Sequence, residues 1–172
     1  MNPKLKRGIT LILTIAVVYL GIDITKKIYY KSQGTALIEQ MPDLELRTLD
    51  GNAFNLQEIL DTKETLLIYY STECSHCIDE VKELRDHSRI LDPYNVYLIS
   101  IEDAKQILRF KDALKIGVQH QLNFLVDPKW EFPQLYNIEA TPSLFFYDKT
   151  GKLTSKHVGS LPTKVIVERL KS

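Results

Sequence analysis

The chain has very few cysteines: Cys74 and Cys77 are the only two among 172 residues. A hydrophobic content of 44% is sufficient for a core of normal size, so these cysteines are not needed as a disulfide scaffold. They stand two residues apart, as Cys-Ser-His-Cys, and the sequence holds neither a second Cys-x-x-Cys nor a His-x-x-x-His pair. A zinc site built from four side chains is therefore disfavoured, and we predict no metal.

Basic residues are in excess only near the N-terminus. Residues 1–31 carry six Lys or Arg against one Asp, a net charge of +5, so the remainder of this neutral chain carries −5. That remainder shows no basic stripe, although binding to nucleic-acid phosphates requires clustered Lys and Arg. Nucleic acid is therefore excluded as the main partner.

Long apolar runs are scarce, and the one that matters is residues 8–22, which carry no charge and lie between cationic flanks. As a helix this run spans roughly 22 Å, short of a hydrocarbon core of about 30 Å, but snorkelling by Arg7 and Lys26 can close the gap. No Ala-x-Ala-like cleavage site follows it. We therefore predict an uncleaved signal anchor over residues 1–31, with a cleaved secretory signal as the alternative. The body would then lie outside the cytoplasm, in an oxidising compartment.

The remainder of the chain is predicted to consist of a linker over residues 32–41 and one domain over residues 42–172. Alternating apolar residues around an Asp-Gly turn predict an N-terminal β-hairpin, followed by a short helix at 56–61. Apolar periodicity predicts further strands at 65–71, 95–102 and about 123–127, helices at 75–91 and 102–117, helical turns interrupted by Pro133, a hairpin at 143–159 and a helix from Pro162. This order predicts an α/β fold in which helices cover both faces of a mixed central sheet.

The two cysteines lie at a strand-to-helix turn. Cys74 directly follows a predicted buried strand, and Cys77 falls in the first turn of the next helix. A helix N-terminus favours a thiolate, which is the species that attacks a disulfide. We predict that Cys74 is the exposed nucleophile, that Cys77 resolves the mixed disulfide, and that the two form a redox disulfide. Protonated His76 would stabilise the thiolate further. A metal site and two inert core thiols are the alternatives.

A proline lies where a strand is expected to begin. Pro142 precedes the run Ser-Leu-Phe-Phe-Tyr, in which a backbone N–H would normally be wanted. A cis Thr141–Pro142 bond would explain the proline and leave the backbone of Thr141 available to an extended substrate. An ordinary trans proline opening a strand is the alternative.

Together these features resemble a known family. The run LLIYYSTECSHC, the later ATPSLFFYDKTGKL and the closing helix resemble the thioredoxin fold. Residues 41–171 resemble the bacterial membrane-anchored thioredoxin-like thiol–disulfide oxidoreductases of the TlpA/ResA type, in the AhpC/TSA–redoxin superfamily. The resemblance implies that Cys74 and Cys77 are the redox pair, that Pro142 is the cis proline beside it, and that Glu80 handles protons.

The resemblance also implies partners and a location. The substrates would be disulfides or dithiols of exported proteins, apocytochromes among them, with a membrane redox partner and no cofactor, at the bacterial cell membrane. Two departures bear on the direction of electron flow. Glu73 stands where members of the family have Trp, and its charge opposes a thiolate at Cys74. Ser75-His76 replaces the Glu-Pro of reductive members, and its His resembles oxidising relatives.

Two other functions remain open at this point. A peroxiredoxin-type peroxidase resembles Pro-x-x-x-Ser/Thr-x-x-Cys; here Ser71 fits that pattern, but Leu67 occupies the proline position. A copper chaperone of the Sco type resembles Cys-x-x-x-Cys, one residue wider than the present pair, and His157 would be its distant ligand. The other histidines, His87 and His120, are interpreted as surface residues.

Overall fold

The computed structural model describes residues 18–22 and 38–171. The described residues belong to two units, one containing residues 18–22 and the other containing residues 38–171. The predicted anchor lies outside the described residues except for residues 18–22, which are helical and exposed. Within the described part of the chain, no helix has both the length and the apolar character needed to cross a membrane.

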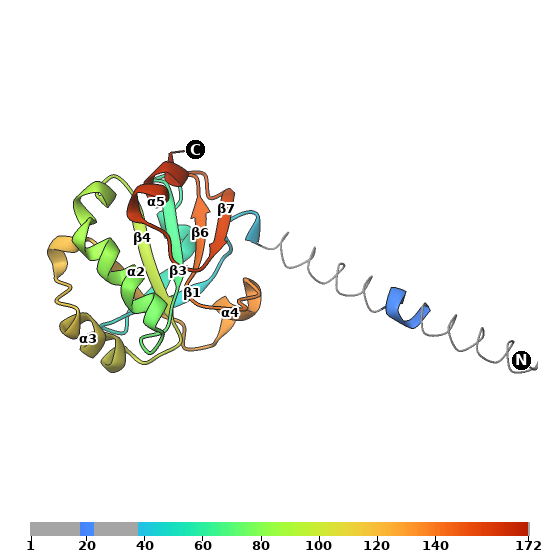
Figure 1. The fold of residues 1–172 in the computed structure, drawn as a ribbon, viewed down its shortest axis with the longest axis horizontal. Coiled ribbons are helices and arrows are strands. Elements are labelled where there is room, and N and C mark those ends of the chain that lie inside the picture. Colours follow the sequence, from blue (N-terminus) through green and yellow to red (C-terminus); the bar gives the residue numbers. More distant parts are fainter. Residues whose placement is uncertain (1–17, 23–37, 172) are drawn as a thin grey trace, which may run out of the picture. The chain divides into compact units, whose positions relative to one another are not determined.

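The folded unit is built on one mixed sheet (Figure 1). Its seven strands run in the order β2-β1-β5-β4-β3-β6-β7. Strands β3, β4 and β5 pair in parallel, whereas β6, β7, β1 and β2 add antiparallel pairs on either side. The strands are β1 (Glu45–Thr48), β2 (Ala53–Asn55), β3 (Thr65–Tyr69), β4 (Asn95–Ser100), β5 (Asn123–Val126), β6 (Ser143–Tyr147) and β7 (Leu153–Val158).

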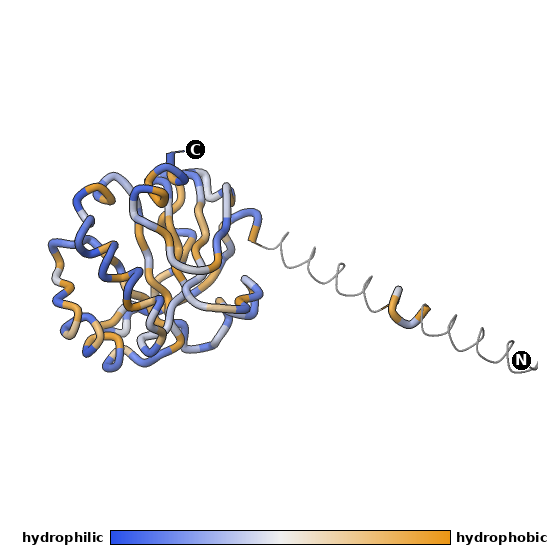
Figure 2. The backbone as a smooth tube through the Cα atoms, viewed as in Figure 1, coloured by the Kyte–Doolittle hydropathy of each residue, from blue (hydrophilic) through white to orange (hydrophobic). Residues whose placement is uncertain are grey.

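Helices cover both faces of this sheet, as the sequence predicted. Helices α2 (Ser75–Asp86), α3 (Ala104–Ala113) and α5 (Thr163–Leu170) contribute to the core on one face. The 3-10 helix η1 (Leu56–Ile59) and helix α4 (Glu131–Leu135) contribute to the core on the other. Figure 2 shows apolar residues running along the central strands between the helical layers.

Strand β3 explains why two separate cores form. Its five residues are all buried, and their side chains alternate between the faces because strand periodicity is two. Leu66 and Ile68 belong to the core under α2, whereas Leu67 and Tyr69 belong to the core under α4. The continuous apolar run at 65–71 therefore predicted a strand buried on both faces correctly.

Two predicted helices end earlier in the structure than the sequence predicted. The helix predicted over 75–91 stops at Asp86, and a separate 3-10 turn, η2 (Ser88–Leu91), follows it. Helix α3 ends at Ala113 instead of Gly117, because Lys115 takes the left-handed conformation (φ +54°) at its end. Ile116 N–H then donates to Lys111 O and Lys115 N–H to Asp112 O, which is a Schellman closure.

Pro133 was predicted to interrupt the helical turns around it, but it lies within one continuous helix, α4. Pro133 lies in the first turn of α4, where its missing N–H has no helical acceptor to lose. Pro162, predicted at the start of the last helix, is the N-cap residue of α5.

Residues 38–41, which lie in the predicted linker, pack against the domain. Ile38 and Met41 are buried, Leu153 N–H donates to Glu39 O at 2.8 Å, and Gln40 forms an isolated β-bridge with Lys152. The rest of the predicted linker, residues 32–37, lies outside the described residues.

Candidate redox site

The Cys-x-x-Cys segment lies at the carboxyl end of β3. The chain leaves β3 through Tyr70, turns over residues 71–73 and enters α2 with Cys74 as the N-cap residue. Cys77 is the third residue of α2 and faces the core together with Val81 and Leu84, because these positions share one helical stripe. Both cysteines are free thiols.

Cys74 is half-buried beside the start of β6. Its Sγ lies 3.5 Å from the carbonyl oxygen of Thr141, to which the thiol donates. The Thr141–Pro142 bond is cis, as expected. Partial burial raises the pKa of the Cys74 thiol, but hydrogen bonds from the Thr141 side chain, the Cys77 thiol and the backbone of Cys77 and His76 outweigh it. The net effect lowers the pKa of Cys74, which favours the nucleophilic thiolate.

Cys77 has the opposite environment. Its side chain is fully buried, and this burial raises the pKa of its thiol to about 12. The backbone N–H of Ser71 opposes the rise by hydrogen bonding to the sulfur, whereas the neighbouring Cys74 adds to it. At neutral pH one sulfur of the pair is therefore poised to attack, and the other holds its proton.

Glu80 lies one helical turn beyond Cys77 and is only 1% exposed. Its Oε2 accepts a hydrogen bond of 2.8 Å from Leu161 N–H, and its Oε1 has no hydrogen-bond partner among the described residues. Burial raises the pKa of Glu80 to about 7; the Leu161 N–H counteracts this, and the charge of Glu83 reinforces it. The carboxyl group can therefore gain or lose a proton near neutral pH.

The other residues singled out near the cysteines are exposed. The side chain of His76 faces solvent, while its backbone oxygen accepts a hydrogen bond of 3.1 Å from Ser160 Oγ. Glu73 is also exposed, and the pKa of Cys74 is lowered with this carboxylate next to it in the chain. The substitution of Glu for Trp before the first cysteine thus leaves the thiolate favoured.

Sequence reasoning missed a carboxylate that contacts the segment before Cys74. Glu102 follows β4 and accepts hydrogen bonds from Ser71 Oγ (2.8 Å) and from Thr72 N–H (3.0 and 3.1 Å to its two oxygens). A signal was available, because β3 and β4 are adjacent parallel strands whose carboxyl ends meet at the same sheet edge. The Glu-Asp pair at the end of the predicted strand 95–102 was therefore a candidate for this position.

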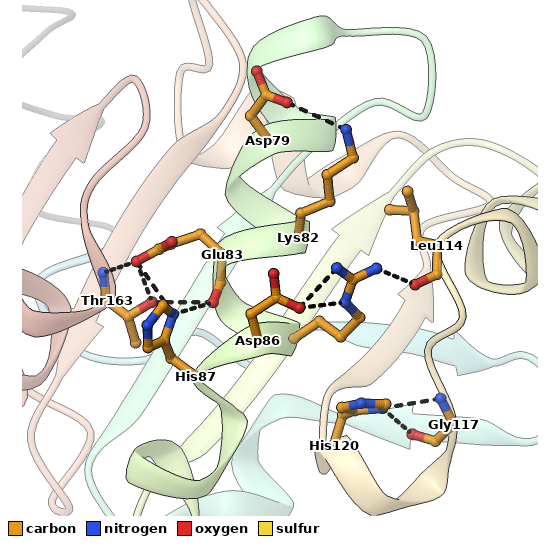
Figure 3. Close-up of polar contacts among 10 residues, drawn as sticks. Asp79, Lys82, Glu83, Asp86, His87, Leu114, Gly117, His120 and Thr163 are labelled. Carbon is orange, nitrogen blue, oxygen red and sulfur yellow. Dashed lines mark hydrogen bonds and ion pairs between the residues drawn. The ribbon is translucent and has the colours of Figure 1, made fainter.

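The far half of α2 is fixed to its neighbours (Figure 3). Glu83 Oε1 accepts from Thr163 N–H at 3.4 Å, which ties α2 to the start of α5, and it lies 3.4 Å from His87 Nδ1. Arg85 Nη1 donates to Leu114 O at 2.6 Å, which ties α2 to the end of α3. These contacts hold the helix that carries both cysteines.

A pocket of about 530 Å³ lies at this far end and does not include the cysteines. Its lining residues are Arg85, Asp86, His87, Ser88, Arg89, Ile90, Gln119 and His120. His120 is held there by a hydrogen bond of 3.0 Å between its Nδ1 and Gly117 N–H. This pocket is therefore distinct from the redox site.

The described residues contain no group of three His, Cys, Asp or Glu side chains placed to hold a metal ion. His157, the distant ligand of the copper-chaperone alternative, lies on β7 opposite Leu144.

The AhpC/TSA family model matches residues 37–156, so the chain belongs to the AhpC/TSA family. The thioredoxin-like protein YneN of Bacillus subtilis is 28% identical over 177 residues, which cover 99% of this chain and 98% of YneN. The thiol-disulfide oxidoreductase YkuV of Bacillus subtilis is 24% identical over 141 residues, which cover 78% and 93% of the two chains.

Solved structures confirm the thioredoxin-like fold. A secreted Mycobacterium tuberculosis disulfide oxidoreductase, homologous to DsbE of E. coli, superimposes with a TM-score of 0.63 at 16% identity, covering 75% of this chain and 95% of that one. The exposed lipoprotein thioredoxin Etrx1 of Streptococcus pneumoniae gives a TM-score of 0.61 at 26% identity, covering 75% and 98%.

Proposed function

We propose that this member of the AhpC/TSA family is a thiol–disulfide oxidoreductase whose redox pair is Cys74 and Cys77. The observation that carries the proposal is the asymmetry of the pair. Cys74 is half-buried with a lowered pKa, and Cys77 is fully buried with its pKa raised to about 12. Thiol–disulfide exchange requires this difference in reactivity, because one thiolate attacks first and the second sulfur reacts only after a mixed disulfide has formed.

The reaction proceeds in two exchanges. The Cys74 thiolate attacks one sulfur of a substrate disulfide; a Cys74–substrate bond forms, and the other substrate sulfur leaves as a thiolate with the bonding electron pair. Cys77 then loses its proton, and its thiolate attacks Cys74 Sγ. The Cys74–Cys77 disulfide forms and the second substrate thiolate leaves, so the substrate gains the two electrons that the protein loses. Run in reverse, the same steps oxidise a dithiol.

Glu80 is the proton acceptor for Cys77 in this scheme. It stands at the i+3 position from Cys77, which places the two side chains on one face of α2. Its unpartnered Oε1 is free to receive a proton, and its pKa of about 7 makes transfer in either direction accessible at neutral pH. Thr141, whose carbonyl oxygen contacts Cys74, lines the position that an extended substrate would occupy.

Trapping tests the assignment of roles. Cys77→Ser should accumulate a stable mixed disulfide with a substrate disulfide, because the resolving sulfur is absent, and Cys74→Ser should form none. Disulfide exchange by Cys74→Ser at the wild-type rate would refute the proposal. Peroxide consumption is measured in parallel, since rapid Cys74-dependent consumption would favour a peroxidase instead. The reduction potential of the pair then gives the direction: a value near about −270 mV indicates a reductant and one near about −120 mV an oxidant.

We further propose that residues 1–31 anchor the protein in the bacterial cell membrane, with the domain outside the cytoplasm. The support is the uncharged run at 8–22 between cationic flanks and the absence of a small-residue cleavage site after it. The substrates would then be exported proteins with disulfides or dithiols, apocytochromes among them, and a membrane partner would exchange electrons with the pair.

Cell fractionation and trapping test the location. The full-length protein should remain with membranes after a high-salt wash, and an added protease should digest the domain in spheroplasts without lysis. Proteins trapped by Cys77→Ser in cells should carry export signals. Recovery of the domain in the soluble cytosolic fraction would contradict the proposal.

A further inference from the structure

Glu102 makes a two-point contact with the segment that leads into Cys74. One carboxylate oxygen accepts both the Ser71 hydroxyl proton and the Thr72 N–H, and the other also faces that N–H at 3.1 Å. Glu102 lies 31 residues after Ser71 and 30 residues after Thr72, so the contact connects the carboxyl ends of β3 and β4. Hydrogen bonds to a carboxylate are about twice as strong as those between neutral groups.

Further contacts fix the same segment. Gln106 Nε2 donates to Thr72 Oγ1 at 3.0 Å, and Glu73 N–H donates to Ser71 Oγ at 3.3 Å. Cys74 N–H donates to Ser71 O at 3.4 Å. Glu102 is therefore the charged centre of a small network, and Ser71 is the residue that connects this network to the redox helix.

Ser71 also reaches the second sulfur. Its side chain is held by Glu102, and its backbone N–H counteracts the rise that burial causes in the pKa of Cys77. Cys77 is buried in an apolar cluster that includes Tyr70, whose hydroxyl has no hydrogen-bond partner among the described residues. In such surroundings a thiolate is costly, and the few N–H groups that face it have a large influence on how readily it forms.

We propose that Glu102 is a positioning residue for the resolving step: by holding Ser71, it keeps the Ser71 N–H directed at Cys77 and so promotes formation of the Cys77 thiolate. This inference rests on the proposed function, and it concerns the second exchange only. In that step the proton of Cys77 passes to Glu80, the thiolate attacks Cys74 Sγ, the Cys74–substrate bond breaks, and the substrate sulfur leaves with the electron pair. The first attack, by Cys74, does not use the Ser71 N–H.

A chromogenic aromatic disulfide such as 5,5′-dithiobis-(2-nitrobenzoate) separates the two exchanges. Mixed with the reduced full-length protein, it releases one coloured thiolate when Cys74 attacks and a second when Cys77 resolves. Glu102→Gln should slow the second release about tenfold, the worth of one charge-assisted hydrogen bond, and leave the first within about twofold. The pH midpoint of the second release, which Glu80 sets, should remain unchanged while the rate falls at every pH.

Asp103→Asn is the matched control. This variant removes the same negative charge one residue away from Glu102. Among the described residues, Asp103 Oδ1 accepts a hydrogen bond only from Gln106 N–H, at 2.8 Å, and an Asn side chain can also cap the helix there. Both releases should stay within about twofold of wild type. Ser71→Ala offers a second test if Glu102→Gln folds poorly, since it keeps the Thr72 contact and should slow the second release about fivefold.

Each outcome has one meaning. A second release slowed only in Glu102→Gln and Ser71→Ala supports the inference. The inference is overturned if Glu102→Gln slows both releases equally. It is also overturned if the second release is as fast in Glu102→Gln as in the control variant Asp103→Asn. Failure of the wild-type protein to give any Cys77-dependent second release would instead overturn the proposed function.

Discussion

The backbone N–H of Leu161 donates a hydrogen bond of 2.8 Å to one carboxylate oxygen of Glu80, while the other oxygen is buried without a hydrogen-bond partner among the described residues. Leu161 belongs to the loop between β7 and α5, and Glu80 lies on α2, so the last loop of the domain covers the acid beside the redox pair. A buried carboxyl group with a hydrogen-bond donor to only one of its two oxygens resists ionisation, because the charged form requires more than one donor.

The first prediction concerns stability against pH. Burial raises the pKa of Glu80 from its usual 4.5 to about 7, so between these values the unfolded state ionises and the folded state does not. The free energy of unfolding of the reduced protein should therefore fall as pH rises through this window, by up to about 3 kcal/mol. Urea unfolding between pH 4.5 and 8 measures the slope. Glu80→Gln should remove this contribution, whereas Asp79→Asn, which changes an exposed neighbour, should retain it.

The second prediction concerns the thiol of Cys77 as a hydrogen-bond donor. Because the Cys77 thiol lowers the pKa of Cys74, Cys77→Ala should raise the pH at which alkylation of Cys74 is half-maximal. Cys77→Ser keeps an O–H donor and should shift that pH less. The rate of reaction with iodoacetamide against pH checks both variants. Identical profiles for the Ala and Ser variants would contradict a donor role.

The third prediction concerns the hydroxyl of Thr141. That side chain also lowers the pKa of Cys74, and Val has nearly the same shape without the hydroxyl. Thr141→Val should slow alkylation of Cys74 at pH 7 about tenfold, the worth of one hydrogen bond to a charged acceptor. Thr141→Ser, which keeps the hydroxyl, should react at close to the wild-type rate. A slow Ser variant would show that the methyl group, and not the hydroxyl, matters.

The fourth prediction concerns the core on the α4 face. Phe132 is fully buried and stacks on Tyr136 with ring centroids 3.9 Å apart, and it also contacts Tyr69 and Phe145. Phe132→Ala should lower the free energy of unfolding by about 3–5 kcal/mol, because it leaves a cavity among these rings. Val118→Ala is the control, since Val118 is 96% exposed and its truncation should change stability by less than about 0.5 kcal/mol.

Local patterns in the sequence predicted the elements well where a single periodicity dominated. The run at 65–71 predicted β3, and the apolar spacing after Ser75 predicted α2. Helix ends were predicted less well, because they depend on particular closing contacts. Gly117 looked like the end of α3, yet Lys115 takes the left-handed position and closes the helix earlier.

The sequence by itself determined the pair of cysteines, their place between a buried strand and a helix, and the proline before a later strand, since spacing and hydrophobic periodicity act over a few neighbouring residues. The environments of these residues were decided by the tertiary structure alone. Glu80 is covered by Leu161, 81 residues later, and Ser71 is held by Glu102, which follows the neighbouring strand β4. Desolvation and hydrogen bonding set a pKa, and both depend on which distant segments pack against a group.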